Sequence, residues 1–280
     1  MNPSPFSAKP TDPQEVLLSV VIPVHNEEKT LESVVRTVRE NQFMPTEIVA
    51  VNDCSLDRSA EVLDSLRERG LIDKVLHHEE NQGKGAALRT GIGATRGEIV
   101  LIQDADLEYD PREYERLVTP ILDDRADVVY GSRFLAGPGT RVRYWHMLMN
   151  RFLTFFSNAL SNLYLTDMET CYKVFRGDFI RAVPLASNRF GFEPEVTARV
   201  SQSRLRVVEE GISYYGRSYS EGKKITWRDG VAALWHITYF NLFADRIEPV
   251  TLPPLLDVIQ SRDDAGGDPS HRGSTSDIVS

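Results

Sequence analysis

Residues 18–28, LSVVIPVHNEE, decide the fold of this chain. They begin with a continuous apolar run that predicts a strand within 17–24, buried on both faces of a parallel sheet. The apolar residues that follow recur at helical spacing and predict a helix over 27–42. The same two patterns then alternate, with strands expected at 47–53, 74–78, 98–106 and 127–134, and helices at 56–70, 84–97 and 111–123.

This alternation predicts the fold class. Strands separated by helices of about 10–15 residues form a right-handed, mostly parallel α/β sheet. Two more apolar helices are expected at 144–165 and 227–243. Ordinary core packing is the favoured explanation for most of their surface, because neither helix is rich in Lys or Arg. A face that rests on a membrane surface is the alternative, since Phe, Tyr and Trp suit the interfacial zone.

Composition limits the classes of protein to which the chain can belong. It has 280 residues, of which 41% are hydrophobic and 26% charged, values that are ordinary for a globular protein. A net charge of -9 argues against a bulk electrostatic grip on nucleic acid, so no nucleic-acid partner is expected. Two cysteines, Cys54 and Cys171, are too few for a disulfide framework and indicate a reduced, cytoplasmic protein.

The two ends of the chain differ from its middle. We expect a flexible tail over 1–16, one domain over 17–248 and a disordered tail over 249–280, because the ends hold too little apolar surface to offset the cost of ordering. The first residues contain no apolar stretch of the kind found in signal peptides. No run of about 18 or more apolar residues occurs, so no transmembrane helix is expected.

Carboxylates gather where the predicted strands end. In open α/β sheets, ligands bind outside the carboxyl ends of the strands. Asp104 and Asp106 end a very apolar strand, and Glu108 lies two residues further on. Clustered carboxylates repel one another, and a bound cation relieves the repulsion. Because hard oxygen ligands suit Mg²⁺ or Mn²⁺, these three residues are candidate metal ligands, although a short DxD segment is also compatible with a solvated or capping role.

Other strand ends and the second half of the chain offer candidate phosphate contacts. Gly83-Lys84-Gly85 opens a helix, where backbone N–H groups and a lysine suit a phosphate. Glu193 lies in a predicted loop rich in Gly, Pro and aromatic residues, where a carboxylate could orient a substrate or act as a base. Basic residues that could bind phosphate, or that could equally be solvated surface charges, are Arg133, Lys173, Arg217, Lys223 and Lys224.

Several common catalytic motifs are missing. No G-x-G-x-x-G follows the first strand, which excludes the usual dinucleotide-binding interpretation. The sequence also lacks a P-loop, a G-x-S-x-G nucleophile elbow, an H-E-x-x-H zinc motif and a C-x-x-C pair. The function therefore has to be sought in the carboxylates and basic residues at the sheet edge.

A resemblance to a known family is carried by eight segments in order: PVHNEE, VNDCSLD, NQGKGAALRTGI, QDADLEYDP, GSRF, TDMETCYKVFR, FGFEPE and GRSYSEGKK. As a set they resemble the family 2 glycosyltransferases of the GT-A fold, and in particular the dolichyl-phosphate mannosyltransferase and polyprenyl-phosphate glycosyltransferase branch. The resemblance runs from about Leu18 to Phe243. It implies a Rossmann-like nucleotide-sugar fold, a Mg²⁺ or Mn²⁺ cofactor and C-terminal amphipathic helices. Many bacterial relatives also have C-terminal membrane spans, which have no counterpart here, so peripheral association with the inner face of a membrane would rest on those helices.

The resemblance implies a role for each candidate residue. The nucleotide sugar would be bound by Pro23, His25, Glu27, Asp53, Lys84, Asp104, Ala105 and Asp106. Asp53 would hold the base, where Asn52 replaces the first residue of the commoner Asp-Asp pair. The metal on the diphosphate would be held by Asp104, Asp106 and Glu108. The donor diphosphate and the acceptor phosphate would be bound by Arg133, Lys173, Arg217 and Lys223.

The implied reaction is the metal-dependent, inverting transfer of a hexose from GDP-mannose or UDP-glucose to a polyprenyl phosphate, such as dolichyl or undecaprenyl phosphate. Asp106, Arg133 and Glu193 are the expected catalytic residues. A lipid phosphate is already an anion and needs no general base, whereas a hydroxyl acceptor on a glycan or small molecule would need a carboxylate such as Glu193 to take its proton. Both acceptors stay open.

Two further classes rank lower. A sugar-phosphate nucleotidyltransferase would carry a Gly-rich, Arg-containing loop after the first strand, where this chain has PVHNEE. A non-catalytic nucleotide-sugar binder would have no need of the intact pair Asp104 and Asp106.

Overall fold

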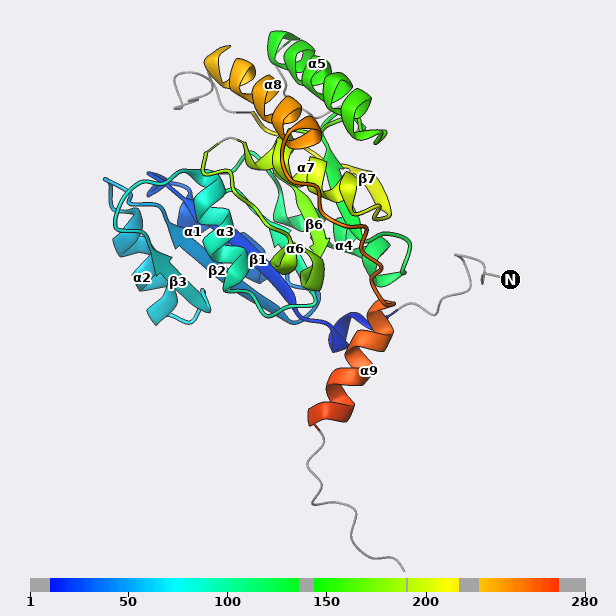
Figure 1. Cartoon of the computed structure of the whole chain (residues 1–280). Coiled ribbons are helices and arrows are strands. Elements are labelled where there is room, and N and C mark those ends of the chain that lie inside the picture. The colour runs from blue at the N-terminus through cyan, green and yellow to red at the C-terminus, as the bar shows by residue number, and fades with distance from the viewer. Residues whose placement is uncertain (1–10, 136–143, 190, 217–226, 267–280) are drawn as a thin grey trace, which may run out of the picture.

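The computed structural model describes residues 11–135, 144–189, 191–216 and 227–266. Within these ranges the strands form one seven-stranded sheet in the order β3-β2-β1-β4-β6-β5-β7 (Figure 1). The strands are β1 (Leu18–Val24), β2 (Thr46–Asn52), β3 (Lys74–His77), β4 (Ile99–Ile102), β5 (Val128–Ser132), β6 (Lys173–Arg176) and β7 (Val207–Gly211).

The sheet is mostly parallel. β1 pairs in parallel with β2 and β4, β2 with β3, and β5 with β7, whereas β6 runs antiparallel to both of its neighbours. The predicted mostly parallel α/β class and the five predicted strands are therefore confirmed. The sequence interpretation missed β6 and β7, which lie in the half of the chain where the strand and helix periods are least regular.

Helices cover both faces of the sheet. They are α1 (Leu31–Glu40), α2 (Ser59–Glu68), α3 (Lys84–Gly93), α4 (Tyr114–Leu122), α5 (Tyr144–Ser161), α6 (Gly177–Ala182), α7 (Phe192–Gln202), α8 (Trp227–Leu242) and α9 (Leu255–Gly266), with 3₁₀ turns η1 (Pro13–Glu15) and η2 (Pro111–Glu113). The chain moves outward from β1 to β3 and then returns to β4, so right-handed crossovers place α1 and α2 on one face and α3 on the other. Gly91 lets α3 approach the sheet, because a Cβ there would lie 2.5 Å from Cγ1 of Val21.

Three helices form a further layer beyond the second half of the sheet. α7 packs against α5 and α8, and α5 and α8 lie side by side on the outside (Figure 1). Core packing explains only one side of α5: Leu153 is buried, whereas Leu148, Phe152 and Phe155 are 45%, 50% and 71% exposed. Among the described helices, none combines the length and the apolar character needed to cross a bilayer.

Parts of both predicted tails are ordered. At the N-terminal end, the backbone N–H of Thr11 donates to the carbonyl of Leu122, and Val16 is fully buried. At the C-terminal end, the prediction of disorder from 249 onward is wrong for α9, which lies beside η1 (Figure 1). Leu255 and Ile259 bury one side of this helix, and Arg262 forms an ion pair with Glu98 at 2.7 Å. The two apolar residues join the hydrophobic core, and the ion pair joins the helix to the residue before β4.

Candidate active site

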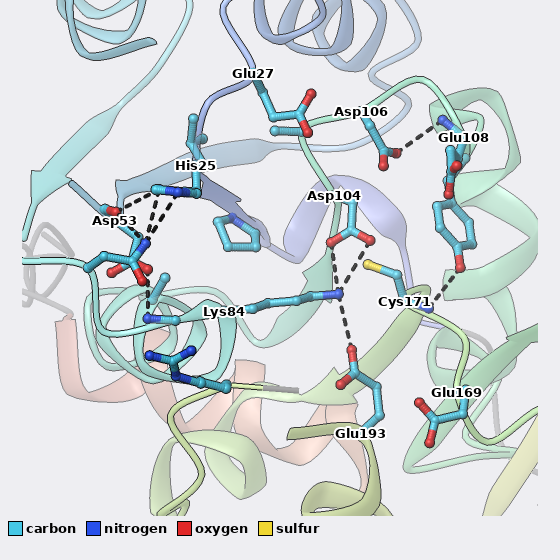
Figure 2. A pocket seen from close by; sticks show the side chains of 18 of the residues that line it. His25, Glu27, Asp53, Lys84, Asp104, Asp106, Glu108, Glu169, Cys171 and Glu193 are labelled. Atoms are coloured by element: carbon cyan, nitrogen blue, oxygen red, sulfur yellow. Dashed lines mark hydrogen bonds and ion pairs between the residues drawn. The ribbon is translucent and has the colours of Figure 1, made fainter. Parts of the chain in front are cut away.

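A cavity of about 430 Å³ lies at the carboxyl ends of the first strands and extends toward α7 (Figure 2). It is lined by most of the predicted site residues: Pro23, His25, Glu27, Asp53, Lys84, Asp104, Ala105, Asp106, Glu108, Arg133 and Glu193. Arg217, Lys223 and Lys224 lie outside the described residues. The sheet topology therefore brings together residues that are up to 170 positions apart in sequence, counting from Pro23 to Glu193.

Asp53 holds the loop that precedes α3. Its carboxylate accepts hydrogen bonds from the backbone N–H groups of Gln82 (2.9 Å) and Gly83 (2.7 Å), and it lies 2.8 Å from Nδ1 of His78. Burial alone would raise the pKa of Asp53, but these hydrogen bonds bring it below its ordinary value. Since a carboxylate has about four acceptor positions, three of which are used here, Asp53 has little capacity left for a nucleotide base.

The N-terminus of α3 differs from its predicted role as a phosphate cradle. The N–H groups of Gly85 and Ala86 donate to the carbonyls of Arg189 (3.2 Å) and Asn188 (3.0 Å). Gly83 adopts a φ of 95°, and a Cβ at that position would lie 2.5 Å from the carbonyl oxygen of Asn188. The backbone donors of this helix are thus capped by the loop that precedes α7, and the side chain of Lys84 is what the segment contributes to the cavity.

Lys84 bridges the two sides of the cavity. Its ammonium group lies 2.9 Å from Oδ1 of Asp104, after β4, and 3.0 Å from Oε1 of Glu193, on α7 (Figure 2). Burial alone would lower the pKa of Lys84, but the neighbouring carboxylates, Asp104 above all, raise it well above the ordinary value. Lys84 therefore stays cationic and holds two carboxylates from distant parts of the chain beside each other.

The predicted metal ligands were tested against the geometry. Among the described residues, no group of three or more His, Cys, Asp or Glu side chains converges on one point. Glu108 accepts a hydrogen bond from the hydroxyl of Tyr214 (2.6 Å), and its backbone N–H donates to Asp106 (3.1 Å). The expectation of a third protein ligand at Glu108 is therefore not supported. Asp104 and Asp106 still fit, because Mg²⁺ is commonly bound by one or two carboxylates together with substrate phosphates.

Arg133 enters the cavity in a fixed orientation. Its Nε and Nη2 donate to the two oxygens of Asp167, at 2.6 and 2.7 Å, and its guanidinium lies 5.1 Å from the ring centre of Tyr214. Asp167 is buried and is held by a loop whose N–H groups donate to Glu209. A bidentate pair of this kind fixes the plane of the guanidinium, so the direction in which Arg133 can bind an anion is set in advance.

Two predictions for the second half need correction. Lys173 does not line the cavity: it is fully buried in β6 and donates to the carbonyls of Met168 (3.0 Å) and Thr170. In this position it stabilises a loop and does not reach a phosphate. Glu193 does not lie in a loop but in the first turn of α7, where Pro194 is tolerated because the first N–H groups of a helix have no partner within it.

The sequence interpretation missed several lining residues. They include Asn81, Tyr109, Glu169, Cys171, Arg189 and Tyr214. Glu169 and Cys171 belong to the segment 167–173, in which only the lysine was singled out. Arg189 and Tyr214 reach the cavity from loops whose spacing in sequence gives no sign of their position, so only the long-range packing could have found them.

Comparison with known proteins gives the family. Residues 19–183 match the model of the family described as "Glycosyl transferase family 2". An undecaprenyl-phosphate mannosyltransferase from Micrococcus luteus is 28% identical over 212 residues, which cover 72% of this chain and 85% of that protein. A dolichyl-phosphate beta-glucosyltransferase from Trichomonas vaginalis is 28% identical over 222 residues, which cover 72% of this chain and 67% of that protein.

Solved structures show the same fold. The crystal structure of glucosyl-3-phosphoglycerate synthase from Mycobacterium tuberculosis, in complex with Mn²⁺, UDP and glucosyl-3-phosphoglycerate, matches with a TM-score of 0.62 at 18% identity and covers 87% of this chain and 92% of its own. This likeness confirms the predicted GT-A fold. The family match spans more than half of the chain, from β1 to the end of α6. The chain thus belongs to glycosyl transferase family 2 and is a glycosyltransferase.

Proposed function

We propose that this enzyme transfers a hexose from a nucleotide sugar, GDP-mannose or UDP-glucose, to a polyprenyl phosphate, with inversion at the anomeric carbon. The observation that carries the proposal is the ion pair of 3.0 Å between Lys84 and Glu193. Glu193 is the carboxylate best placed to act as a base, and it is paired with the ammonium group of Lys84. A phosphate acceptor is already an anion and needs no base, so this pairing favours it. The relatives named for undecaprenyl phosphate and dolichyl phosphate support the same acceptor class.

The donor would bind on the side of β1, β2 and β4. The proposed diphosphate site is formed by Asp104 and Asp106, because paired carboxylates at a strand end can share a divalent cation with phosphate oxygens. The synthase structure with Mn²⁺ and UDP supports this assignment. A bound Mg²⁺ or Mn²⁺ would supply positive charge to the departing nucleoside diphosphate. Lys84 would keep the carboxylate of Asp104 oriented.

The acceptor would bind on the side of Arg133. Asp167 binds Nε and Nη2 of this arginine, and we assign the remaining Nη1 donors to the phosphate of the acceptor. The low exposure of the guanidinium strengthens an interaction of this kind, since it is screened little by water. The acceptor oxygen would then attack the anomeric carbon from the face opposite to the leaving diphosphate.

The outer helices would bring the cavity to a lipid surface. Trp145 and Phe155 of α5 are 76% and 71% exposed, and Trp235 of α8 is 61% exposed. These helices lie side by side (Figure 1), and both carry exposed aromatic side chains. Exposed apolar groups on neighbouring helices are typical of an interaction site, and Trp, Tyr and Phe suit the headgroup zone of a bilayer. We therefore propose peripheral membrane association through α5 and α8.

A hydroxyl acceptor is the second candidate, because the carboxylate of Glu193 does line the cavity. Release from Lys84 would leave it able to take a proton from a sugar or glycerate hydroxyl. The two candidates share the donor site and differ only in the role of this one residue.

Transfer assays would test the proposal. The purified protein would be given Mg²⁺ or Mn²⁺ with GDP-mannose, UDP-glucose or UDP-GlcNAc, with and without a short-chain polyprenyl phosphate, beside an Asp106→Ala variant. Metal-dependent transfer to the lipid phosphate, absent in the variant, is the expected result. Donor hydrolysis without lipid transfer would overturn the acceptor assignment and favour the hydroxyl.

A further inference from the structure

Glu169 is a cavity carboxyl to which the reaction described above assigns no role. It lines the cavity, and its Oε1 atom is buried and accepts no hydrogen bond from any described residue. Figure 2 shows Glu169 and Glu193 in the same part of the cavity. A buried carboxylate oxygen without a donor is unfavourable when it carries charge, unless a nearby cation compensates it.

The charged groups around Glu169 come from every element packed against it. Glu193 of α7 and Asp167 of the same loop repel a negative charge, whereas Lys173 of β6 and Arg133 after β5 attract it. Both cations are already engaged, Lys173 by two backbone carbonyls and Arg133 by Asp167. Burial, followed by the charge of Glu193, raises the pKa of Glu169 to about 7. Glu193 itself is paired with Lys84 at 3.0 Å, whereas Oε1 of Glu169 has no partner among the described residues.

A proton on Glu169 would help the enzyme to bind an anionic acceptor. An ionised Glu169 would repel an incoming phosphate, in a cavity that already contains several carboxylates. A neutral carboxyl instead offers an O–H donor, and hydrogen bonds from O–H groups to anionic oxygens are short and strong. A bound phosphate would give the carboxyl group of Glu169 a hydrogen-bond partner and would accept the hydrogen bond from its O–H.

We propose that Glu169 is neutral in the acceptor-binding form of the enzyme and donates a hydrogen bond to an oxygen of the acceptor phosphate. This inference rests on the proposed function. The proton stays on Glu169 throughout, so no bond to it forms or breaks, and the residue acts by selecting an anion and positioning it.

The pH dependence of transfer tests this inference. A phosphate monoester gains its second charge near pH ~6, so transfer should rise there, and it should fall above about pH 7 as Glu169 ionises.

Glu169→Gln keeps the shape of the side chain and an N–H donor. This variant should lower the maximal rate a few-fold and lose the alkaline fall. Glu169→Ala should raise KM for the acceptor phosphate about tenfold or more below about pH 7, where Glu169 of the wild type is neutral, because a hydrogen bond to a charged group is lost. Glu115→Gln, an exposed change of the same charge on α4, is the matched control and should keep the wild-type profile.

A second readout separates this inference from the proposed function. Carboxyl ¹³C NMR of the glutamate-labelled protein, without donor or acceptor, should show one resonance that titrates near pH 7 and is missing in Glu169→Gln. Absence of that resonance, or an alkaline limb that persists in Glu169→Gln, would overturn the inference. If the resonance is present but the wild type transfers only to hydroxyls, the proposed acceptor has failed and the hydrogen bond to phosphate is overturned with it.

Discussion

The two sides of the cavity hold their charged residues in different ways. On the side of β1, β2 and β4, the carboxylates of Asp53 and Asp104 lie one and two residues after the strands that position them. On the side of β5, β6 and α7, Arg133 is held by a carboxylate 34 positions away, that of Asp167. The first arrangement follows from strand order alone, because parallel strands end at one edge. The second depends on ion pairs that form only when the domain is complete.

Removing a carboxylate from the donor side should have the largest effect. We expect Asp106→Ala to reduce transfer by about 10²–10³-fold, as for the loss of one electrostatic contact to a developing charge. Melting temperature should change little, because Asp106 lies at the cavity and not in the apolar core. Steady-state transfer and thermal unfolding would be compared with those of Asp123→Asn, a matched loss of charge after α4. An Asp106→Ala enzyme that keeps near wild-type transfer would contradict the donor-site assignment.

Lys84 joins the two sides, so its removal should affect both. Lys84→Met would leave Asp104 and Glu193 facing each other without a cation. Because removal of one partner from a buried ion pair leaves an uncompensated charge, we expect about 10–10²-fold slower transfer and a lower melting temperature than that of the wild type. Lys84→Arg should recover part of both. A melting temperature of Lys84→Met equal to that of the wild type would show that the bridge is not formed.

The same contrast explains what the sequence could and could not predict. The apolar runs and their spacing predicted β1 to β5, and the residues at the ends of these strands do line the cavity. The capping of α3 by Asn188 and Arg189 could not be predicted, because it depends on a loop about a hundred positions further along the chain. Lys173 was misjudged for a similar reason: a lysine in a short strand gives no sign in sequence that β6 will be buried between two neighbours.

The outer helices should matter for lipid substrates only. Replacing Trp145 and Trp235 together by Ser removes two exposed aromatic side chains from neighbouring helices. We expect about tenfold weaker binding to anionic vesicles, and a similar loss of transfer to a long-chain acceptor in those vesicles, since interfacial binding scales with buried apolar area. Sedimentation with vesicles measures the first and transfer measures the second. Transfer to a short, water-soluble polyprenyl phosphate should change little, and an equal loss with both acceptors would argue for a packing role instead.

The smallest effect is expected at Glu193, and it decides between the two acceptors. Glu193→Gln removes the charge but keeps the shape of the side chain in the first turn of α7, and Asp104 remains as a partner for Lys84. With a phosphate acceptor no proton has to be removed, so transfer should fall by about threefold or less. With a hydroxyl acceptor, loss of the general base should slow transfer by about 10²–10⁴-fold.

Glu195→Gln is an unsuitable control, because Glu195 accepts hydrogen bonds from the backbone of Ala186 and Ser187. Glu210→Gln, on β7, changes the same charge outside the cavity. A large loss in Glu193→Gln beside an unchanged control would reverse the acceptor assignment while leaving the donor side intact, because Lys84 keeps Asp104 as its partner.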